Sequence, residues 1–261
     1  HIIQGNLKKK SLMSSQLNDI AELFKKSEKR LIILDYDGTL VPFNKDPSEA
    51  LPSQSLIKLL RSLVSLRDLD LAIVSGRDMN FLENIFGDID VIIFAEHGAG
   101  RRINGEWISL HRKELTWQNE IMKIMQEVTD TTPGSMIERK KTSVVWHYRN
   151  TDKWLADLRA TQLINKLIYP CTRKKLHLMR GNKIIEVKPS EFTKGTAIRR
   201  FFDYSNYDFI LAAGDDTTDE DMFDALPRNA ITFKIGEASP KARYTIRDVD
   251  RFLKFLRMLL N

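Results

Sequence analysis

The chain has little cysteine, no long apolar run and no glycine-rich nucleotide motif. Its 261 residues include one cysteine, Cys171, which excludes an internal disulfide bond and suits a reducing compartment such as the cytoplasm. No apolar run approaches the length of a membrane-spanning helix, and no apolar stretch follows the early lysines as in a signal peptide. The nucleotide-binding motifs GxGxxG and GxxxxGK[ST] do not occur, so no motif marks a nucleotide site. The sequence therefore predicts a soluble cytoplasmic protein with no membrane partner.

The chain also lacks an initiator methionine and opens at His1. We therefore interpret it as a fragment or a tagged form, such as the C-terminal part of a longer protein.

The net charge is +6, and the basic residues come in short clusters. No zinc-finger spacing or aromatic RNA-binding motif accompanies them, so nucleic-acid binding ranks last among the functions considered. Solvated surface charge explains most clusters, and an anionic small substrate such as a phosphate is the second interpretation. The clusters are Lys25-Lys26, Arg101-Arg102, Arg139-Lys140-Lys141 and Arg173-Lys174-Lys175.

Apolar runs that end in polar residues and glycine alternate with helical patterns over most of the chain. The run at 31–34 is typical of a strand buried on both faces of a parallel sheet. This rhythm predicts an α/β fold with a doubly wound, Rossmann-like parallel-sheet core. The other expected core strands span 69–74, 91–94, 209–213, 230–235 and 243–246.

The rhythm changes between residues 111 and 187. Amphipathic patterns at 115–128 and 154–168 stand beside hairpin-like segments at 135–148 and 176–187. Helices next to antiparallel hairpins describe a separate α+β module. The predicted organisation is a linker and N-terminal helix at 1–29, a core domain at 30–110 and 188–261, and an inserted α+β domain at 111–187.

Polar residues follow the predicted core strands and open a predicted helix. Because the carboxyl ends of parallel strands share one edge, we expect these side chains to meet there. Several carboxylates at one edge favour a hard divalent cation such as Mg²⁺, and a lysine and a serine could hold a phosphoryl group. The residues are Asp35, Asp37, Ser75, Glu96, His97, Lys194, Asp215, Asp216 and Asp219.

Four motifs in this order resemble those of the haloacid dehalogenase superfamily: Asp-x-Asp-Gly-Thr, a serine after the second strand, Lys-Gly at a helix start, and Gly-Asp-Asp-x-x-Asp. Within it, LDYDGTL, SGR, AEHG, VVWHYR and GDDTTDE resemble the trehalose-6-phosphate phosphatase family. The resemblance runs from about residue 30 to the end. In that family the domain can follow a trehalose-6-phosphate synthase domain, which is therefore an expected covalent partner.

The resemblance implies a two-step phosphoryl transfer on a sugar phosphate. Asp35 would be the nucleophile that forms an aspartyl-phosphate, and Asp37 the general acid and then the base. Ser75 and Lys194 would stabilise the phosphoryl oxygens. Mg²⁺ would be held by Asp35, the backbone carbonyl of Asp37 and Asp215, while Asp216 and Asp219 would orient its waters.

The resemblance also implies a set of substrate-binding residues, with the inserted domain as a cap that closes over the sugar. Glu138, Lys140 and Arg149 are expected in cap strands that face the core domain. Lys188 competes with Lys194 for the phosphate, and the position of Lys194 at a helix start favours the latter. The full set is Gly38, Thr39, Gly76, Arg77, Glu96, His97, Gly98, Glu138, Lys140 and Arg149.

Each motif alone also has a structural interpretation. Asp-x-Asp-Gly is common in solvated turns, Ser75 could cap a helix, and acids at a helix start account for Glu220 and Asp221. Trp146 and Tyr148 are expected to pack inside the cap. The order of the four motifs favours catalysis.

Two functions compete with trehalose 6-phosphate hydrolysis. The first is a phosphatase of the same superfamily that acts on another sugar phosphate, such as sucrose phosphate. The second is a non-catalytic sugar-phosphate-binding domain that regulates an attached synthase. Such a regulatory domain should carry damaged motifs, whereas the catalytic carboxylates and the lysine are all present here.

Overall fold

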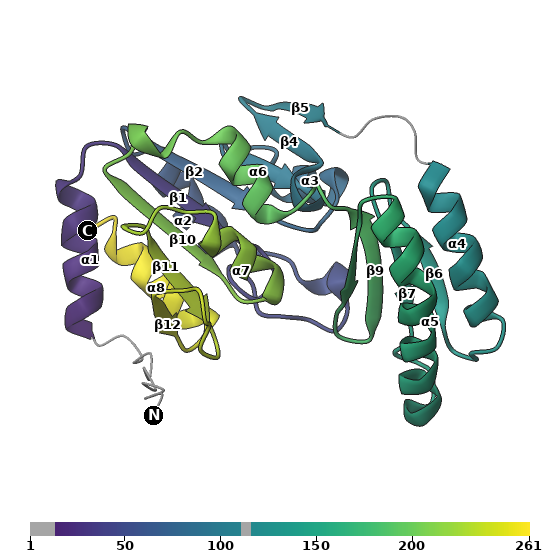
Figure 1. Cartoon of the computed structure of the whole chain (residues 1–261). Helices are drawn as coiled ribbons and strands as arrows, with labels where there is room; N and C mark the ends of the chain where they lie inside the picture. The colour runs from purple at the N-terminus through teal and green to yellow at the C-terminus, as the bar shows by residue number, and fades with distance from the viewer. Residues whose placement is uncertain (1–13, 111–115) are drawn as a thin grey trace, which may run out of the picture. The chain divides into compact units, whose positions relative to one another are not determined.

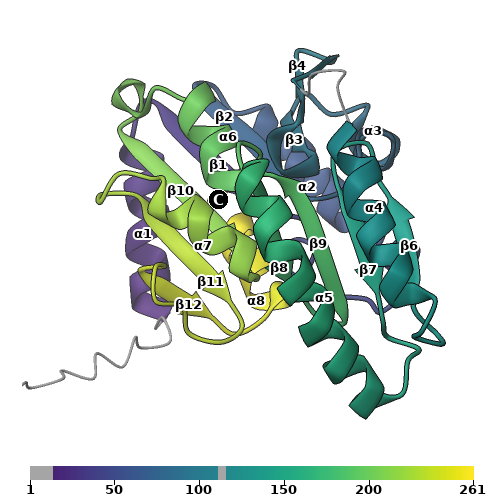
Figure 2. The same cartoon turned by 45° about the vertical axis from the view of Figure 1, so that its right-hand side comes forward.

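The structure, a computed structural model, describes residues 14–110 and 116–261. The chain divides into two compact units, one formed by His1–Leu110 with Thr193–Asn261 and the other by His111–Phe192 (Figures 1 and 2). The predicted linker before the first helix and the predicted start of the inserted domain at residue 111 lie outside the described residues.

Within the described residues, the first unit contains an eight-stranded sheet in the order β12-β11-β10-β1-β2-β3-β4-β5. The strands from β12 to β3 run parallel, and the hairpin of β4 and β5 joins β3 antiparallel. The α/β class with a parallel-dominated sheet is thus confirmed. The strands are β1 Arg30–Leu34, β2 Leu69–Val74, β3 Ile92–Ala95, β4 Gly100–Ile103, β5 Glu106–Ser109, β10 Phe209–Gly214, β11 Ile231–Ile235 and β12 Tyr244–Ile246.

Helices cover both faces of this sheet because its central strand is apolar on both sides. Ile32 and Leu34 pack with the helices of one face, and Leu31 and Ile33 with those of the other. Figures 1 and 2 show α6 and α7 together on one side. The first face carries α1 Ser14–Lys26, α2 Gln54–Val64, α3 Met79–Phe86 and α8 Val249–Met258, and the second carries α6 Lys194–Phe201 and α7 Thr217–Asp224.

Helix α1 belongs to the first unit's core. Its Ile20 and Phe24 are buried, and the Phe24 ring packs edge-on against Phe209 with 5.3 Å between centroids. The turn after the helix is fixed by Asp208, whose carboxylate accepts from the backbone N–H groups of residues 28 and 29. The predicted N-terminal helix therefore packs on the parallel sheet.

Within the described residues, the second unit contains a four-stranded antiparallel sheet in the order β6-β7-β9-β8, with two helices against it. Trp146 and Tyr148 are buried in its core, as predicted, and Trp146 donates its indole N–H to Thr129. The elements are α4 Thr116–Thr129, β6 Met136–Arg139, β7 Val144–His147, α5 Lys153–Arg173, β8 Leu176–Arg180 and β9 Ile184–Pro189.

The second boundary of the inserted unit lies at Phe192, beyond the predicted residue 187. Strand β9 continues to Pro189, since Lys188 and Pro189 pair with His177 and Leu176 of β8. Lys188 therefore belongs to the sheet of the second unit. None of the described helices is long and apolar enough to cross a membrane.

Two leucines of α5 test the core of the second unit. Leu163 is fully buried, whereas Leu158 is 44% exposed on the same helix. We expect Leu163→Ala to lower the free energy of unfolding by about 2–5 kcal/mol, because it removes packed methyl groups and leaves a cavity. The matched Leu158→Ala change should stay within about 0.5 kcal/mol. Urea unfolding followed by tryptophan fluorescence measures both, and equal losses would contradict the assigned packing.

Candidate active site

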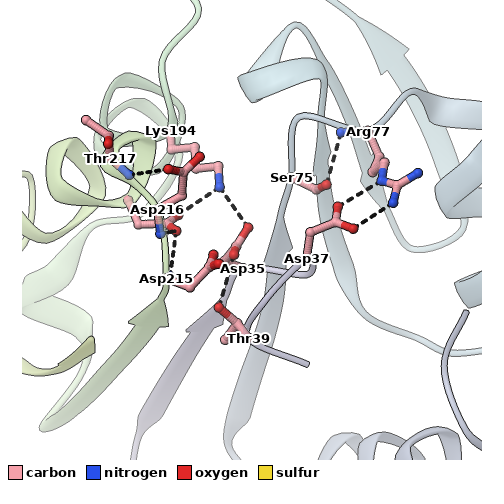
Figure 3. Close-up of polar contacts among 10 residues, drawn as sticks. Asp35, Asp37, Thr39, Ser75, Arg77, Lys194, Asp215, Asp216 and Thr217 are labelled. Carbon is pink, nitrogen blue, oxygen red and sulfur yellow. Dashed lines mark hydrogen bonds and ion pairs between the residues drawn. The ribbon is translucent and has the colours of Figure 1, made fainter. Parts of the chain in front are cut away.

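Asp35 lies directly after β1, where its backbone N–H donates to the carbonyl of Ala213 in the neighbouring strand. Its side chain is buried, with the residue only 4% exposed. One carboxylate oxygen accepts a hydrogen bond from Lys194 Nζ at 2.8 Å, and the other accepts from the Thr39 hydroxyl at 3.0 Å (Figure 3). Each oxygen therefore has a fixed direction.

Lys194 is the first residue of α6, which Thr193 caps by accepting from the backbone N–H of Thr196. Its ammonium group is buried between two carboxylates, 2.8 Å from Asp35 and 2.7 Å from Asp219. The structure thus places Lys194 next to Asp35, as the position of this lysine at a helix start favours.

Asp219 has no exposed surface, and both of its oxygens accept hydrogen bonds. Oδ1 accepts from Lys194, while Oδ2 accepts from the backbone N–H groups of Asp215 and Asp216 at 2.9 and 3.0 Å. A Cβ on Gly214 would lie 2.3 Å from Asp219 Cγ, so only glycine fits there. Asp219 therefore fixes both the lysine and the loop after β10.

Asp215 completes a group of three carboxylates. One oxygen from each of Asp35, Asp215 and Asp219 lies within 4.8 Å of the others. The Asp215 Oδ1 atom is buried and makes no hydrogen bond. Gly38, which has φ +76°, lets the chain pass beside it, because a Cβ there would lie 1.8 Å from Asp215 Oδ2.

The pKa values of these acids are raised, mainly because burial penalises the charged form. The pKa of Asp35 rises to about 7, because burial and the charge of Asp215 outweigh the attraction of Lys194. Burial raises the pKa values of Asp215 and Asp219 to about 6. The pKa of Lys194 is raised, because the charges of Asp219 and Asp35 outweigh the lowering effect of burial. One ammonium thus faces three carboxylates.

This arrangement fits a hard divalent cation. Such ions take oxygen ligands, and Asp215 Oδ1 is a buried carboxylate oxygen that lacks a partner. Asp215 Oδ1 is the oxygen that could bind such an ion directly, with Asp35 beside it as a second candidate ligand. Asp219 is suited to positioning them, since its oxygens are already engaged by three donors.

Two of the five predicted metal-site residues lie outside this group. Asp216 is exposed and caps α7, with its carboxylate accepting from the N–H of Thr217, because the residue stands at the helix start. The Asp37 carboxylate binds Arg77 and points away from Asp35 and Asp215 (Figure 3). The structure therefore narrows the carboxylate cluster to Asp35, Asp215 and Asp219.

Ser75 follows β2 at the same edge and is buried. Its hydroxyl accepts from the backbone N–H of Arg77, and its carbonyl accepts from the N–H of His97. A Cβ at Gly76 would lie 2.7 Å from His97 Nε2, so this glycine leaves room for the histidine ring. The loops after β2 and β3 are thereby joined.

The turn Glu96–Gly98 is strained. Glu96 and His97 have φ values of +51° and +56°, a region that non-glycine residues rarely adopt, and Gly98 follows at +102°. A Cβ on Gly98 would lie 2.5 Å from that of Ala197 in α6. The predicted substrate-binding turn is thus held between the β2 loop and α6.

The predicted sugar-binding residues of the second unit are placed differently from the prediction in two cases. Glu138 lies in β6 and pairs with His147 at 2.9 Å, and this hydrogen bond is the main reason that the pKa of Glu138 is lowered. Lys140 and Arg149 lie beyond the ends of β6 and β7, because each strand stops before the chain turns. The expectation that these two lie in strands is wrong.

Sequence reasoning missed the link between α6 and α7. The Asp221 carboxylate accepts from the backbone N–H of Gly195 at 2.7 Å, and a Cβ on Gly195 would lie 2.5 Å from that carboxylate. The sequence pattern predicts for Asp221 only the role of an acid at a helix start. The glycine after Lys194 is the sequence signal that indicates this close approach.

The three clustered carboxylates and Lys194 lie in a segment that matches a known protein family. The family described as trehalose-phosphatase matches residues 33–249, which include all three clustered carboxylates and Lys194. The chain belongs to the trehalose-phosphatase family. A bifunctional trehalose-6-phosphate synthase/phosphatase from Thermoproteus tenax is 38% identical over 237 residues, which cover 90% of this chain and 32% of that protein. A trehalose-phosphatase from Saccharomyces cerevisiae is 36% identical over 78% of this chain and 25% of its own length.

The chain spans about a third of the length of the first relative and a quarter of the length of the second. Among solved structures, the C-terminal domain of Candida albicans trehalose-6-phosphate phosphatase matches with a TM-score of 0.85 and 32% identity, covering 97% of this chain and 98% of that one. The C-terminal domain of a Candida albicans trehalose synthase regulatory protein shares the fold at 18% identity.

The buried ion pairs of Lys194 give a stability prediction for this family member. We expect Lys194→Met to lower the free energy of unfolding by about 3–5 kcal/mol, because it leaves Asp35 and Asp219 buried without their cation. Urea unfolding in the presence of EDTA measures this. The control Lys241→Met removes a half-exposed pair with Asp224 and should cost less than about 1 kcal/mol. Equal costs would contradict the burial assigned to Lys194.

Proposed function

We propose that the chain hydrolyses trehalose 6-phosphate to trehalose and inorganic phosphate. The observation that carries the proposal is the buried carboxylate of Asp35, fixed by Lys194 and beside Asp215, in a member of the trehalose-phosphatase family. Phosphoryl transfer needs three groups close together: a nucleophile, a cation for the phosphoryl group and an acidic pair that binds a metal.

In the proposed reaction a carboxylate oxygen of Asp35 attacks the phosphorus, the bond to the sugar oxygen breaks, and Asp37 gives that oxygen a proton. Water then attacks the phosphorus of the aspartyl-phosphate, Asp37 takes the proton, and the bond to Asp35 breaks. The two steps consume one water and restore both acids. Lys194 and Ser75 stabilise the charge on the phosphoryl oxygens.

The proposed cofactor is Mg²⁺, held by Asp35, Asp215 and the backbone carbonyl of Asp37. When bound, it neutralises the carboxylate cluster and polarises the phosphoryl group. The unpartnered Asp215 Oδ1 supports this assignment, since it offers a buried ligand atom. Asp219 keeps the lysine and the Asp215 loop in place.

The predicted substrate residues divide into two groups in this proposal. Those of the first unit are on the loops that follow β1, β2 and β3, and those of the second unit are proposed to bind the sugar. The first group is Gly38, Thr39, Gly76, Glu96, His97 and Gly98, and the second is Glu138, Lys140 and Arg149. Arg77, the remaining predicted substrate residue, binds the Asp37 carboxylate instead.

A synthase domain on the same polypeptide is the proposed partner, supported by the bifunctional relative, and the cytoplasm is the proposed location. Hydrolysis of another sugar phosphate is the nearest alternative. A purely regulatory domain fits less well, because the carboxylates and the lysine of phosphoryl transfer are intact.

A substrate panel tests the activity. We expect phosphate release from trehalose 6-phosphate, but not from glucose 6-phosphate or sucrose 6-phosphate, with Mg²⁺ present and lost in EDTA. Asp35→Asn should abolish it, since an amide is not a nucleophile here. Release from a different sugar phosphate would overturn the substrate. No release from any of them by the folded protein would favour the regulatory alternative.

Adjacent aspartates test the metal assignment. Asp215→Asn should lower kcat/KM by about 100-fold or more and raise the Mg²⁺ concentration needed for half-maximal rate, because a charged ligand is lost. Asp216→Asn should remain within about threefold of wild type, since asparagine caps a helix as well as aspartate does. Mg²⁺ titrations of the rate measure both, and a reversed order would exchange the two roles.

A further inference from the structure

Arg77 and Asp37 form a second charged pair at this edge of the sheet, apart from the three clustered acids (Figure 3). The guanidinium Nε donates to Asp37 Oδ2 at 2.8 Å, and Nη2 donates to Oδ1 at 2.6 Å. Two parallel hydrogen bonds to both oxygens fix the plane of the carboxylate as well as its place.

Arg77 is itself held on several sides. Its guanidinium carbon lies 4.1 Å from the ring centroid of Phe81 in α3. Its backbone N–H donates to the Ser75 hydroxyl, and its carbonyl accepts from the N–H of Glu96. Phe81 in turn packs edge-on against Tyr36, with 5.8 Å between centroids. The Arg77 side chain is only 16% exposed.

We propose that Arg77 is a positioning residue for Asp37. Together with Phe81, it sets the orientation from which Asp37 delivers its proton to the leaving oxygen. This rests on the proposed function, in which Asp37 is the general acid. It assigns to Arg77 a role other than the substrate binding expected from the resemblance, because the Nε–Nη2 edge of its guanidinium donates to Asp37.

The chemistry of the guanidinium group makes the proposal testable by a conservative change. Lysine keeps the positive charge but has neither the planar fork nor a flat face to lie on Phe81. Arg77→Lys should therefore leave the charge near Asp37 and lose its orientation. Phe81→Leu removes the aromatic face and keeps an apolar side chain, so it weakens the same support from the other side.

Dependence of the rate on the leaving group separates positioning of an acid from other roles. A nitrophenolate leaves without a proton, whereas a phenolate or a sugar oxygen needs one. A misplaced acid therefore slows substrates with weakly acidic leaving groups selectively. Values of kcat/KM report the step in which the leaving group departs.

The experiment measures kcat/KM for a series of substituted phenyl phosphates, from p-nitrophenyl to phenyl, and for trehalose 6-phosphate, all with Mg²⁺. For Arg77→Lys we expect about a 100-fold loss on phenyl phosphate and on trehalose 6-phosphate, and less than about threefold on p-nitrophenyl phosphate. Phe81→Leu should show a smaller loss of the same form, and Asp37→Asn a larger one. Inhibition by inorganic phosphate should be unchanged in Arg77→Lys. The control Arg173→Lys, at an exposed pair with Glu120, should match wild type.

Other outcomes overturn the proposal. Equal losses on all substrates with weaker phosphate inhibition would make Arg77 a phosphate ligand, and wild-type behaviour would make its pairing only structural. If thermal melting shows that Arg77→Lys is unfolded, Phe81→Leu decides by the same criterion. If the wild type hydrolyses the aryl phosphates but not trehalose 6-phosphate, only the proposed sugar substrate is overturned. No hydrolysis of any of them by the wild type would overturn the proposed function and this proposal together.

Discussion

The rest of the site depends on the buried ammonium of Lys194 between Asp35 and Asp219. Two of the three clustered carboxylates obtain their counter-charge from this one group, and the third, Asp215, has a buried oxygen with no partner. Burial of charges is stable only when they are paired and hydrogen-bonded. The cluster is therefore suited to a further cation. The raised pKa values of its acids reflect the same shortage of positive charge.

The fold serves this ion pair in several ways. Parallel pairing of β1 with β10 places Asp35 beside the Asp215 loop. The close approach of α6 to α7, which Gly195 permits and Asp221 fixes, carries Lys194 to the same point. The glycines of the site matter because side chains occupy the space where their Cβ atoms would lie, most closely at Gly38.

Much of this could be predicted from the sequence because strand ends in a parallel sheet share an edge. An apolar run followed by Asp35, and another followed by Gly214 and Asp215, already indicated that these acids meet. The sequence could not show the pairing of Asp37 with Arg77, because the orientation of that carboxylate depends on a loop forty residues away and on Phe81 beneath it. Nor could it separate Asp216 from Asp219, since one helix turn decides which of them is exposed and which is buried.

The second unit shows where sequence patterns stop being informative. Its helices and hairpins were readable from their periodicity, and Trp146 lies in the core as expected. The predicted end of strand β9 at residue 187 is two residues too early, because Lys188 and Pro189 also pair with β8. Strand pairing depends on the partner strand, which local composition does not reveal.

The central claim is that Asp35 attacks the phosphorus, and trapping its phosphorylated form tests this most directly. The protein would be mixed with trehalose 6-phosphate and Mg²⁺, quenched in acid within one turnover, and reduced with borohydride, which converts an acyl phosphate to an alcohol. Mass spectrometry of the peptides should then show Asp35 reduced to homoserine, only when substrate and Mg²⁺ are both present. Phosphate release with an unmodified Asp35, or with another acid reduced in its place, would contradict the account.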